Sequence, residues 1–187
     1  GIVEQLWKHG GKVQVPTSEN PYPWDVEREG ELGIGRPAVF KPLGSHERMY
    51  REMGVLPTWT CTPYLYGNIP RFGQHLAGEE SSNIVYINSV IGARSNRTPV
   101  LMDIASAIAG RTPYYGLHLS ENRRGEILYN VEAGKLKSED YPAIGILIGK
   151  TVGTKNPVIN GFKGDVSPDD LKNFGAACAT SGAVALY

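Results

Sequence analysis

The sequence lacks long apolar runs, has no excess of either charge and contains only two cysteines. No window holds the roughly eighteen consecutive apolar residues that a membrane-spanning helix needs. Its 19 basic side chains balance 19 acidic ones, which argues against a protein that binds nucleic acid or an anionic membrane. The first residues show neither a basic segment followed by an apolar run nor a small-residue cleavage site. We therefore expect no secretory signal and a cytoplasmic location.

Two cysteines so far apart in the chain exclude a disulfide-rich framework. Cys61 and Cys178 are therefore either buried thiols or ligands and nucleophiles, and the sequence alone leaves both alternatives open. The four histidines give no further hint of a metal site, because they show no metal-ligand spacing.

The residues that are present indicate a globular α/β protein. Hydrophobic residues make up 41% of the chain and charged residues 20%, which is enough for a real core. The 23 glycines and 13 prolines favour many tight turns, as in enzymes whose sites are built from loops. We expect helices layered on a mostly parallel sheet. Both ends look cut, so residues 1–187 are expected to be a segment of a longer polypeptide, with a sub-boundary near 133–140.

Local patterns predict the main elements. The segment Ser167–Asp170 is typical of a helix start, with serine at the N-cap, proline at the first helical position and an acid at the third. Gly54, Gly110 and Gly175 are expected to end helices. A strand remains the alternative to a helix over 141–152. The expected helices are 45–53, part of 74–91, 99–109, 141–152 and 167–174; the expected strands are 12–15, 126–132 and 157–159; the expected loops are 17–43 and 56–73.

Two apparent motifs are interpreted as chance matches. Residues 145–151 end like a phosphate-binding loop, but the first glycine is one position too close and the segment is too apolar to bind phosphate with exposed amides. Residues 96–98 fit the glycosylation sequon, yet no secretory signal is expected. Neither segment therefore supports a functional assignment.

The first informative cluster surrounds the two cysteines. Cys61 stands in the polar, hydroxyl-rich loop 58–64, a setting that suits a metal-bound thiolate. Cys178 stands among the small residues of 175–182, which permit close approach of a bulky inorganic group. We take these two cysteines as candidate metal ligands, with Thr60 and Thr62 as candidate substrate-binding residues.

The second cluster is the polar segment 88–97. Its two arginines offer forked donors that bind carboxylate or phosphate, although a solvated helix end is the alternative. Upstream, the carboxylate of Glu80 suits an acid or a base, or an ion pair with one of these arginines. The substrate-binding candidates here are Asn88, Arg94, Asn96 and Arg97, and the catalytic candidates are Glu80, Ser81 and Ser89.

These clusters and several shorter segments, taken in chain order, resemble the aconitase X family, a divergent branch of the aconitase superfamily. The resemblance covers nearly the whole chain, and several ordered motifs are far more specific than any single one. The matching segments are 15–17, 53–64, 80–82, 86–97, 110–113, 116–119 and 175–182.

The resemblance implies a hydro-lyase that removes water from a hydroxylated carboxylate with the help of iron. The family binds iron through three cysteines, as a 4Fe-4S or 2Fe-2S cluster or as a single ion, and Cys61 and Cys178 match two of them. Three thiolates leave an open iron position that acts as a Lewis acid on the substrate hydroxyl. The third cysteine and a serine-containing motif are expected outside this chain. A small swivelling subunit is the expected partner.

The resemblance also implies one of two substrates. Members of the family dehydrate either cis-3-hydroxy-L-proline or mevalonate 5-phosphate, and segments 67–73 and 115–119 favour the second. Gly78–Glu79 and Thr98–Pro99 depart from the family pattern at the expected rim of the pocket. An alternative to an enzyme is a non-catalytic module that binds metal or serves assembly, in which both cysteines are structural.

Overall fold

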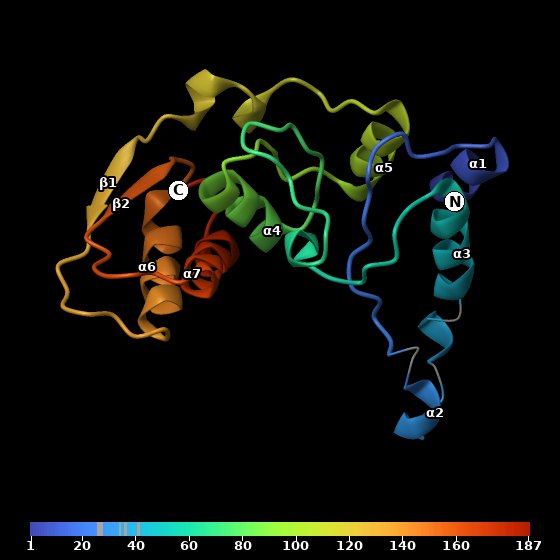
Figure 1. The fold of residues 1–187 in the computed structure, drawn as a ribbon, viewed down its shortest axis with the longest axis horizontal. Coiled ribbons are helices and arrows are strands. Elements are labelled where there is room, and N and C mark those ends of the chain that lie inside the picture. The colour runs from blue at the N-terminus through green and yellow to red at the C-terminus, as the bar shows by residue number, and fades with distance from the viewer. Residues whose placement is uncertain (26–27, 34, 36, 41) are drawn as a thin grey trace. The chain divides into compact units, whose positions relative to one another are not determined.

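The computed structural model describes residues 1–25, 28–33, 35, 37–40 and 42–187, which form two compact units (Figure 1). Unit 1 comprises Gly1–Ile69 and Ile104–Arg111, and unit 2 comprises Pro70–Asp103 and Thr112–Tyr187. Helix α5 (Val100–Ala109) contributes residues to both. Within the described residues, no helix combines the length and apolarity needed to cross a membrane. The sub-boundary near 133–140 falls in a loop of unit 2 and stays a prediction.

Unit 1 is built around one long helix and a small core. Met53, Val55 and Ile104 are buried there, against partly buried side chains that include Leu6 and Trp7. Trp7 Nε1 donates to the Glu52 carboxylate at 2.7 Å. The elements of unit 1, besides the end of α5, are α1 (Ile2–Lys8), α2 (Glu29–Leu32), η1 (Ala38–Phe40), α3 (Leu43–Met53) and η2 (Pro63–Leu65).

Two sequence predictions for unit 1 need correction. Helix α3 ends at Gly54 as predicted, but it begins two residues before Ser45, whose hydroxyl donates to the Pro42 carbonyl at 2.6 Å. The strand predicted over 12–15 is absent. The Val13 N–H bonds to the Met53 carbonyl and the Gln14 N–H to the Ala107 carbonyl, so both groups are satisfied without a sheet. The prediction for 17–43 falls partly outside the described residues.

Unit 2 contains the α/β layer that the composition predicted. Strands β1 (Ile127–Asn130) and β2 (Pro157–Asn160) pair in parallel, with Ile127 opposite Pro157. The helix predicted over 141–152 is confirmed by α6 (Asp140–Val152), and the strand alternative is wrong. The fold class is confirmed as α/β with a small parallel sheet. The other elements are α4 (Ser81–Tyr86), the π-helical turn η3 (Ile87–Ile91), η4 (Gly116–His118), η5 (Ser120–Arg123) and α7 (Pro168–Ser181).

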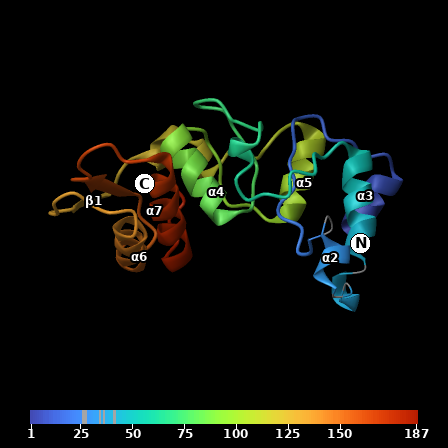
Figure 2. The same cartoon turned by 60° about the horizontal axis from the view of Figure 1, so that its bottom comes forward.

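Glycines let α6 and α7 approach closely. A Cβ atom at Gly145 would lie 2.5 Å from the Phe174 carbonyl oxygen, and one at Gly149 would lie 2.7 Å from the Cys178 carbonyl oxygen. The two helices lie side by side in both views (Figures 1 and 2). Residues 145–151 are therefore a helix-packing segment, which agrees with the rejection of a phosphate loop there.

Helix α7 begins as predicted and ends later than predicted. Ser167 is its N-cap and forms a capping box with Asp170. Gly175, however, does not end the helix, which runs on to Ser181. A Cβ atom at Gly175 would lie 2.7 Å from Val85 Cγ1 of α4, so this glycine is needed for close packing. The sequence pattern did not distinguish a packing glycine from a terminating one.

Helix α7 lies between α6 and α4 and carries the centre of the core (Figure 2). Phe174 is fully buried, and the rings of Phe162 and Tyr187 meet it edge to face at centroid distances of 5.3 and 4.8 Å. Cys178 lies in the same cluster, one turn further along α7. The core of unit 2 is thus aromatic around the middle of α7.

The helical pattern predicted within 74–91 is correct only for its second half. Helix α4 begins at Ser81, where the Glu80 side chain accepts the Asn83 N–H at 2.7 Å as an N-cap. Before it, His75 and Arg94 form a parallel β-bridge. Helix α5 agrees with the prediction for 99–109.

Candidate functional site

The residues predicted to carry function fall in both units. Thr60, Cys61 and Thr62 belong to unit 1, and all the others belong to unit 2. Each group is built by the elements of its own unit.

The loop that carries Cys61 is held by hydroxyl groups. The Thr62 N–H donates to Thr60 Oγ1 at 3.1 Å, and the two threonine hydroxyls lie 3.1 Å apart. Trp59 has a φ of 46°, in the left-handed region that residues other than glycine rarely adopt. The Cys61 side chain between these groups is partly exposed. The loop therefore presents its thiol from a tightly turned backbone.

The same loop is tied to Glu19, a residue that the sequence analysis missed. The Glu19 carbonyl accepts the Thr58 hydroxyl at 3.1 Å and the Thr60 N–H at 3.4 Å. Burial raises the pKa of the Glu19 carboxyl to about 7, with a further rise from Glu47. Its Oε2 is buried without a hydrogen-bond partner among the described residues. No motif marks this residue, so only the structure reveals it.

In unit 2, the predicted catalytic residues have structural partners. The Glu80 carboxylate caps α4 and also accepts the Ser82 hydroxyl at 2.6 Å. Ser89 Oγ accepts the Tyr187 N–H at 3.0 Å. Ser81 Oγ lies 3.5 Å from a guanidinium nitrogen of Arg97. Ser81 is thus the predicted catalytic residue that faces a predicted anion-binding side chain.

Asn88 is buried, and its side chain connects several segments of unit 2 by hydrogen bonds. Its Nδ2 donates to the carbonyls of Ser95 and Ala185, both at 2.9 Å. Its Oδ1 accepts the Ser95 N–H and an N–H of Arg123, both at 3.0 Å. Only 2% of Asn88 is exposed, and these four bonds use the full capacity of its amide. In this arrangement the amide has no group left for a substrate.

Arg94 supports a pair of stacked histidines. Its guanidinium donates to the His118 carbonyl at 2.8 Å and to the Ser120 hydroxyl at 2.9 Å. The Nδ1 atoms of His75 and His118 lie 2.9 Å apart, and the ring centroids 5.0 Å. Burial lowers the pKa of His118, and nearby positive charges add to the effect. Both terminal nitrogens of the Arg94 guanidinium are therefore hydrogen-bonded to protein groups.

Asn96 and Arg97, by contrast, line a cavity of about 760 Å³ in unit 2. The Asn96 side chain donates to the Tyr115 carbonyl at 3.0 Å and accepts the Leu117 N–H at 2.8 Å. Arg97 donates to the Ala183 carbonyl at 2.7 Å, which fixes one side of its guanidinium. Of the residues predicted to bind an anion, these two face open space.

Two further cations on this cavity escaped the sequence analysis. Arg124 and Lys155 line it together with Arg97. They are separated by about thirty residues in sequence and belong to no motif. The adjacent basic pair Arg123–Arg124 was the available signal, although only its second member faces the cavity.

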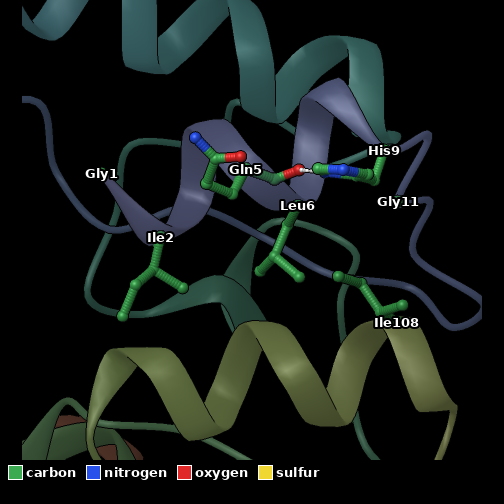
Figure 3. A pocket seen from close by; sticks show the side chains of 7 residues that line it. All are labelled: Gly1, Ile2, Gln5, Leu6, His9, Gly11 and Ile108. Atoms are coloured by element: carbon green, nitrogen blue, oxygen red, sulfur yellow. Dashed lines mark hydrogen bonds between the residues drawn. The ribbon is translucent and has the colours of Figure 1, made fainter.

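Unit 1 contains a different hollow, of about 640 Å³, beside α1 (Figure 3). The side chains of Ile2, Leu6 and Ile108 make it mainly apolar. Its one imidazole is engaged, since His9 Nδ1 lies 2.8 Å from the Gln5 carbonyl oxygen. None of the predicted site residues lines this hollow, and apart from His9 no acidic or basic side chain does.

The two cysteines differ in how well they fit iron, the metal that the family resemblance implies. Cys61 is partly exposed on a polar loop and suits a ligand. Cys178 is fully buried in the aromatic core, and burial raises the pKa of its thiol to about 12, which disfavours the thiolate that a metal needs. Among the described residues, no group of three or more His, Cys, Asp and Glu side chains is placed to hold a metal. In this conformation burial keeps the Cys178 thiol protonated, and its role as a metal ligand stays a prediction.

Comparisons with known proteins cover the whole chain. The family model described as "Aconitase X first domain" matches residues 1–121, and "Aconitase X second domain" matches residues 125–187. A crystal structure of Thermococcus kodakaraensis aconitase X in its holo-form superposes with a TM-score of 0.86 at 38% identity, over 100% of this chain and 45% of that one.

Curated relatives bear two names. The phosphomevalonate dehydratase large subunit of Methanothermobacter thermautotrophicus is 45% identical over 185 residues, which are 99% of this chain and 46% of that protein. The cis-3-hydroxy-L-proline dehydratase of Hypocrea jecorina is 39% identical over 195 residues, covering 100% of this chain and 32% of that protein. The chain thus spans half or less of the length of these relatives. With both domain models matched in order, the chain belongs to the aconitase X family.

Proposed function

We propose that the protein containing this chain is an iron-dependent hydro-lyase that dehydrates mevalonate 5-phosphate. The observation that carries the proposal is the similarity along the full chain to proteins named phosphomevalonate dehydratase large subunit. Five relatives bear this name, at 45%, 42%, 41%, 39% and 31% identity, and two relatives named cis-3-hydroxy-L-proline dehydratase are 39% and 37% identical. The second substrate remains the alternative.

The local geometry supports an anionic substrate at unit 2. Arg97 keeps part of its fork directed at the cavity and has the Ser81 hydroxyl beside it. Asn88 and Arg94 act there as supports, because their polar atoms bond to protein groups. In this proposal Asn96 and Arg97 contact the substrate, and Asn88 and Arg94 hold the segment that carries them.

The proposal includes two partners of the chain. Iron is bound with Cys61 as one ligand, and residues of the longer protein complete the ligand set. A small subunit completes the enzyme, since the relatives are named large subunits.

The test uses the full-length protein purified anaerobically with its small subunit. Iron and sulfide are measured, and dehydration is assayed with mevalonate 5-phosphate and with cis-3-hydroxy-L-proline. We expect bound iron and turnover of the phosphorylated substrate. Turnover of hydroxyproline alone would replace the proposed substrate, and absence of iron and of both activities would favour the non-catalytic module.

A further inference from the structure

The cavity of unit 2 holds three cationic side chains without ionic partners. Arg97, Arg124 and Lys155 all line it. None of the salt bridges among the described residues involves any of them. Cations that line a hollow and form no close ion pair there favour an anionic ligand, because the ligand then supplies a counter-charge.

Hydrogen bonds from two asparagine side chains connect the segments that line the cavity between these cations. Asn122 Nδ2 donates to the Gly116 carbonyl at 3.0 Å. Asn156 Nδ2 donates to the Asn122 carbonyl at 2.8 Å and to the Arg124 carbonyl at 3.2 Å. Asn156 therefore ties the backbone of Arg124 to the segment that carries Lys155. The backbone positions of two cations from distant parts of the chain are thus linked on one surface, which reduces the cost of bringing them together when a ligand binds.

The cavity joins the two matched domains. Asn96, Arg97 and Tyr115 come from the part that matches the first domain, whereas Lys155 and Ala183 come from the part that matches the second. A ligand in this cavity therefore contacts both domains within unit 2.

Two carboxylates also line the cavity, and they limit its positive charge. Glu126 Oε2 accepts the Asn156 N–H at 2.9 Å, which holds it against the wall. Glu121 is exposed and forms none of the salt bridges in the described part of the chain. Three cations against two carboxylates leave one net positive charge, so removal of Glu121 should strengthen anion binding and removal of a cation should weaken it.

We infer that Arg124 and Lys155, with Arg97, bind the phosphate group of a phosphorylated substrate in this cavity. The arginine forks suit the planar arrangement of two phosphate oxygens, and the lysine supplies a point charge. The identity of the phosphate carrier rests on the proposed function, whereas the phosphate site rests on the cavity itself.

Kinetics of the full-length enzyme with its small subunit test the inference. We expect Lys155→Met and Arg124→Gln each to raise KM for mevalonate 5-phosphate by about tenfold or more, with kcat within about twofold, because the phosphate lies away from the reacting bond. The control is Lys150→Met, the same change at an exposed lysine of α6 outside the cavity. Unchanged KM in both cavity variants would overturn the inference and leave the proposed function intact.

Inorganic phosphate provides a readout that does not depend on turnover. Binding of radiolabelled phosphate to the same protein is measured by equilibrium dialysis. It should weaken in Lys155→Met and Arg124→Gln and strengthen in Glu121→Gln. With an active enzyme, phosphate should also inhibit competitively against substrate. The protein could fail to dehydrate mevalonate 5-phosphate while its cavity variants still lose phosphate binding. That result would refute the proposed substrate and keep the phosphate site. Noncompetitive inhibition, or no phosphate binding to the unaltered protein, would refute the site.

Discussion

The loop around Cys61 and the core around Cys178 place the same side chain in opposite surroundings. Cys61 is partly exposed, and the hydroxyls of the threonines on either side of it in sequence lie 3.1 Å apart, whereas Cys178 is fully buried in the same core cluster as Phe174. The sequence predicts a metal ligand in both segments, because each contains a cysteine among small or polar residues. The difference teaches that surroundings in space, which the neighbouring residue types do not reveal, set how readily a thiol ionises, because burial raises its pKa.

The largest expected effect separates the two cysteines directly. In the full-length protein, Cys61→Ser should remove most of the iron and lower activity by at least about 100-fold, because a metal ligand is lost. Cys178→Ala should keep the iron content. Iron analysis after anaerobic purification measures both, and iron loss in Cys178→Ala alone would reverse the assignment.

The second prediction tests the core that encloses Cys178. Phe174→Ala should lower the opening free energy of α6 and α7 by about 3–5 kcal/mol, because a fully buried aromatic ring is replaced by a cavity. Amide hydrogen exchange of the full-length protein reports this locally. The exposed Phe72→Ala, with 88% of its surface accessible, is the matched control and should change exchange in these helices little.

A smaller effect is expected where the two helices touch. Gly149→Ala should destabilise the α6–α7 pair by about 1–3 kcal/mol, since its Cβ would press on the Cys178 carbonyl. Gly134→Ala is the control, because nothing lies within 4 Å of a Cβ at that position. Equal hydrogen exchange in the two variants would show that α6 can move away at no cost.

The smallest expected effect is a pH dependence of stability that comes from Glu19, the residue bonded to the Cys61 loop. Burial raises the pKa of Glu19 from 4.5 to about 7, so the folded protein binds this proton more tightly than the unfolded chain. Stability should therefore fall as pH rises from about 4.5 to 7. Glu19→Gln should remove that dependence and stabilise unit 1 near neutral pH by on the order of 1 kcal/mol, a value reduced for solvent screening of a half-buried group.

Hydrogen exchange of unit 1 as a function of pH checks this prediction. A pH dependence that persists in Glu19→Gln would assign it to another group. A loss of stability in this variant at pH 7 would show that the ionised carboxylate is favourable where it lies.

The sequence predicted local features better than distant contacts. The cap at Ser167 and the end of α3 at Gly54 depend on a few neighbouring residues, and both are confirmed. The prediction that Gly175 ends a helix is wrong, because a glycine is needed there to pack against Val85, ninety residues earlier in the chain. Local periodicity carries no information on such a contact.

The candidate site shows the same limit. The polar segment 88–97 was recognisable by its residue types, but Asn88 and Arg97 play different parts in it. Asn88 is engaged by groups 7, 35 and 97 residues away, which no spacing rule reveals. Lys155 reaches the cavity only through the fold, because the parallel pairing of β1 and β2 brings Asn156 beside Glu126. A lone lysine in the sequence does not indicate an anion site, so Lys155 could not be predicted.

The buried amide of Asn88 also determines how this protein can be dissected. Its side chain bonds to Arg123, just after the first matched domain, and to Ala185 near the end of the second. A gene divided between residues 121 and 125 would always separate Asn88 from Ala185, and a cut before Arg123 would remove that partner too, with a loss of about 1–3 kcal/mol for each stranded group. The domain boundary of the family is thus a poor place to split the polypeptide, and halves made there should need co-expression to stay folded.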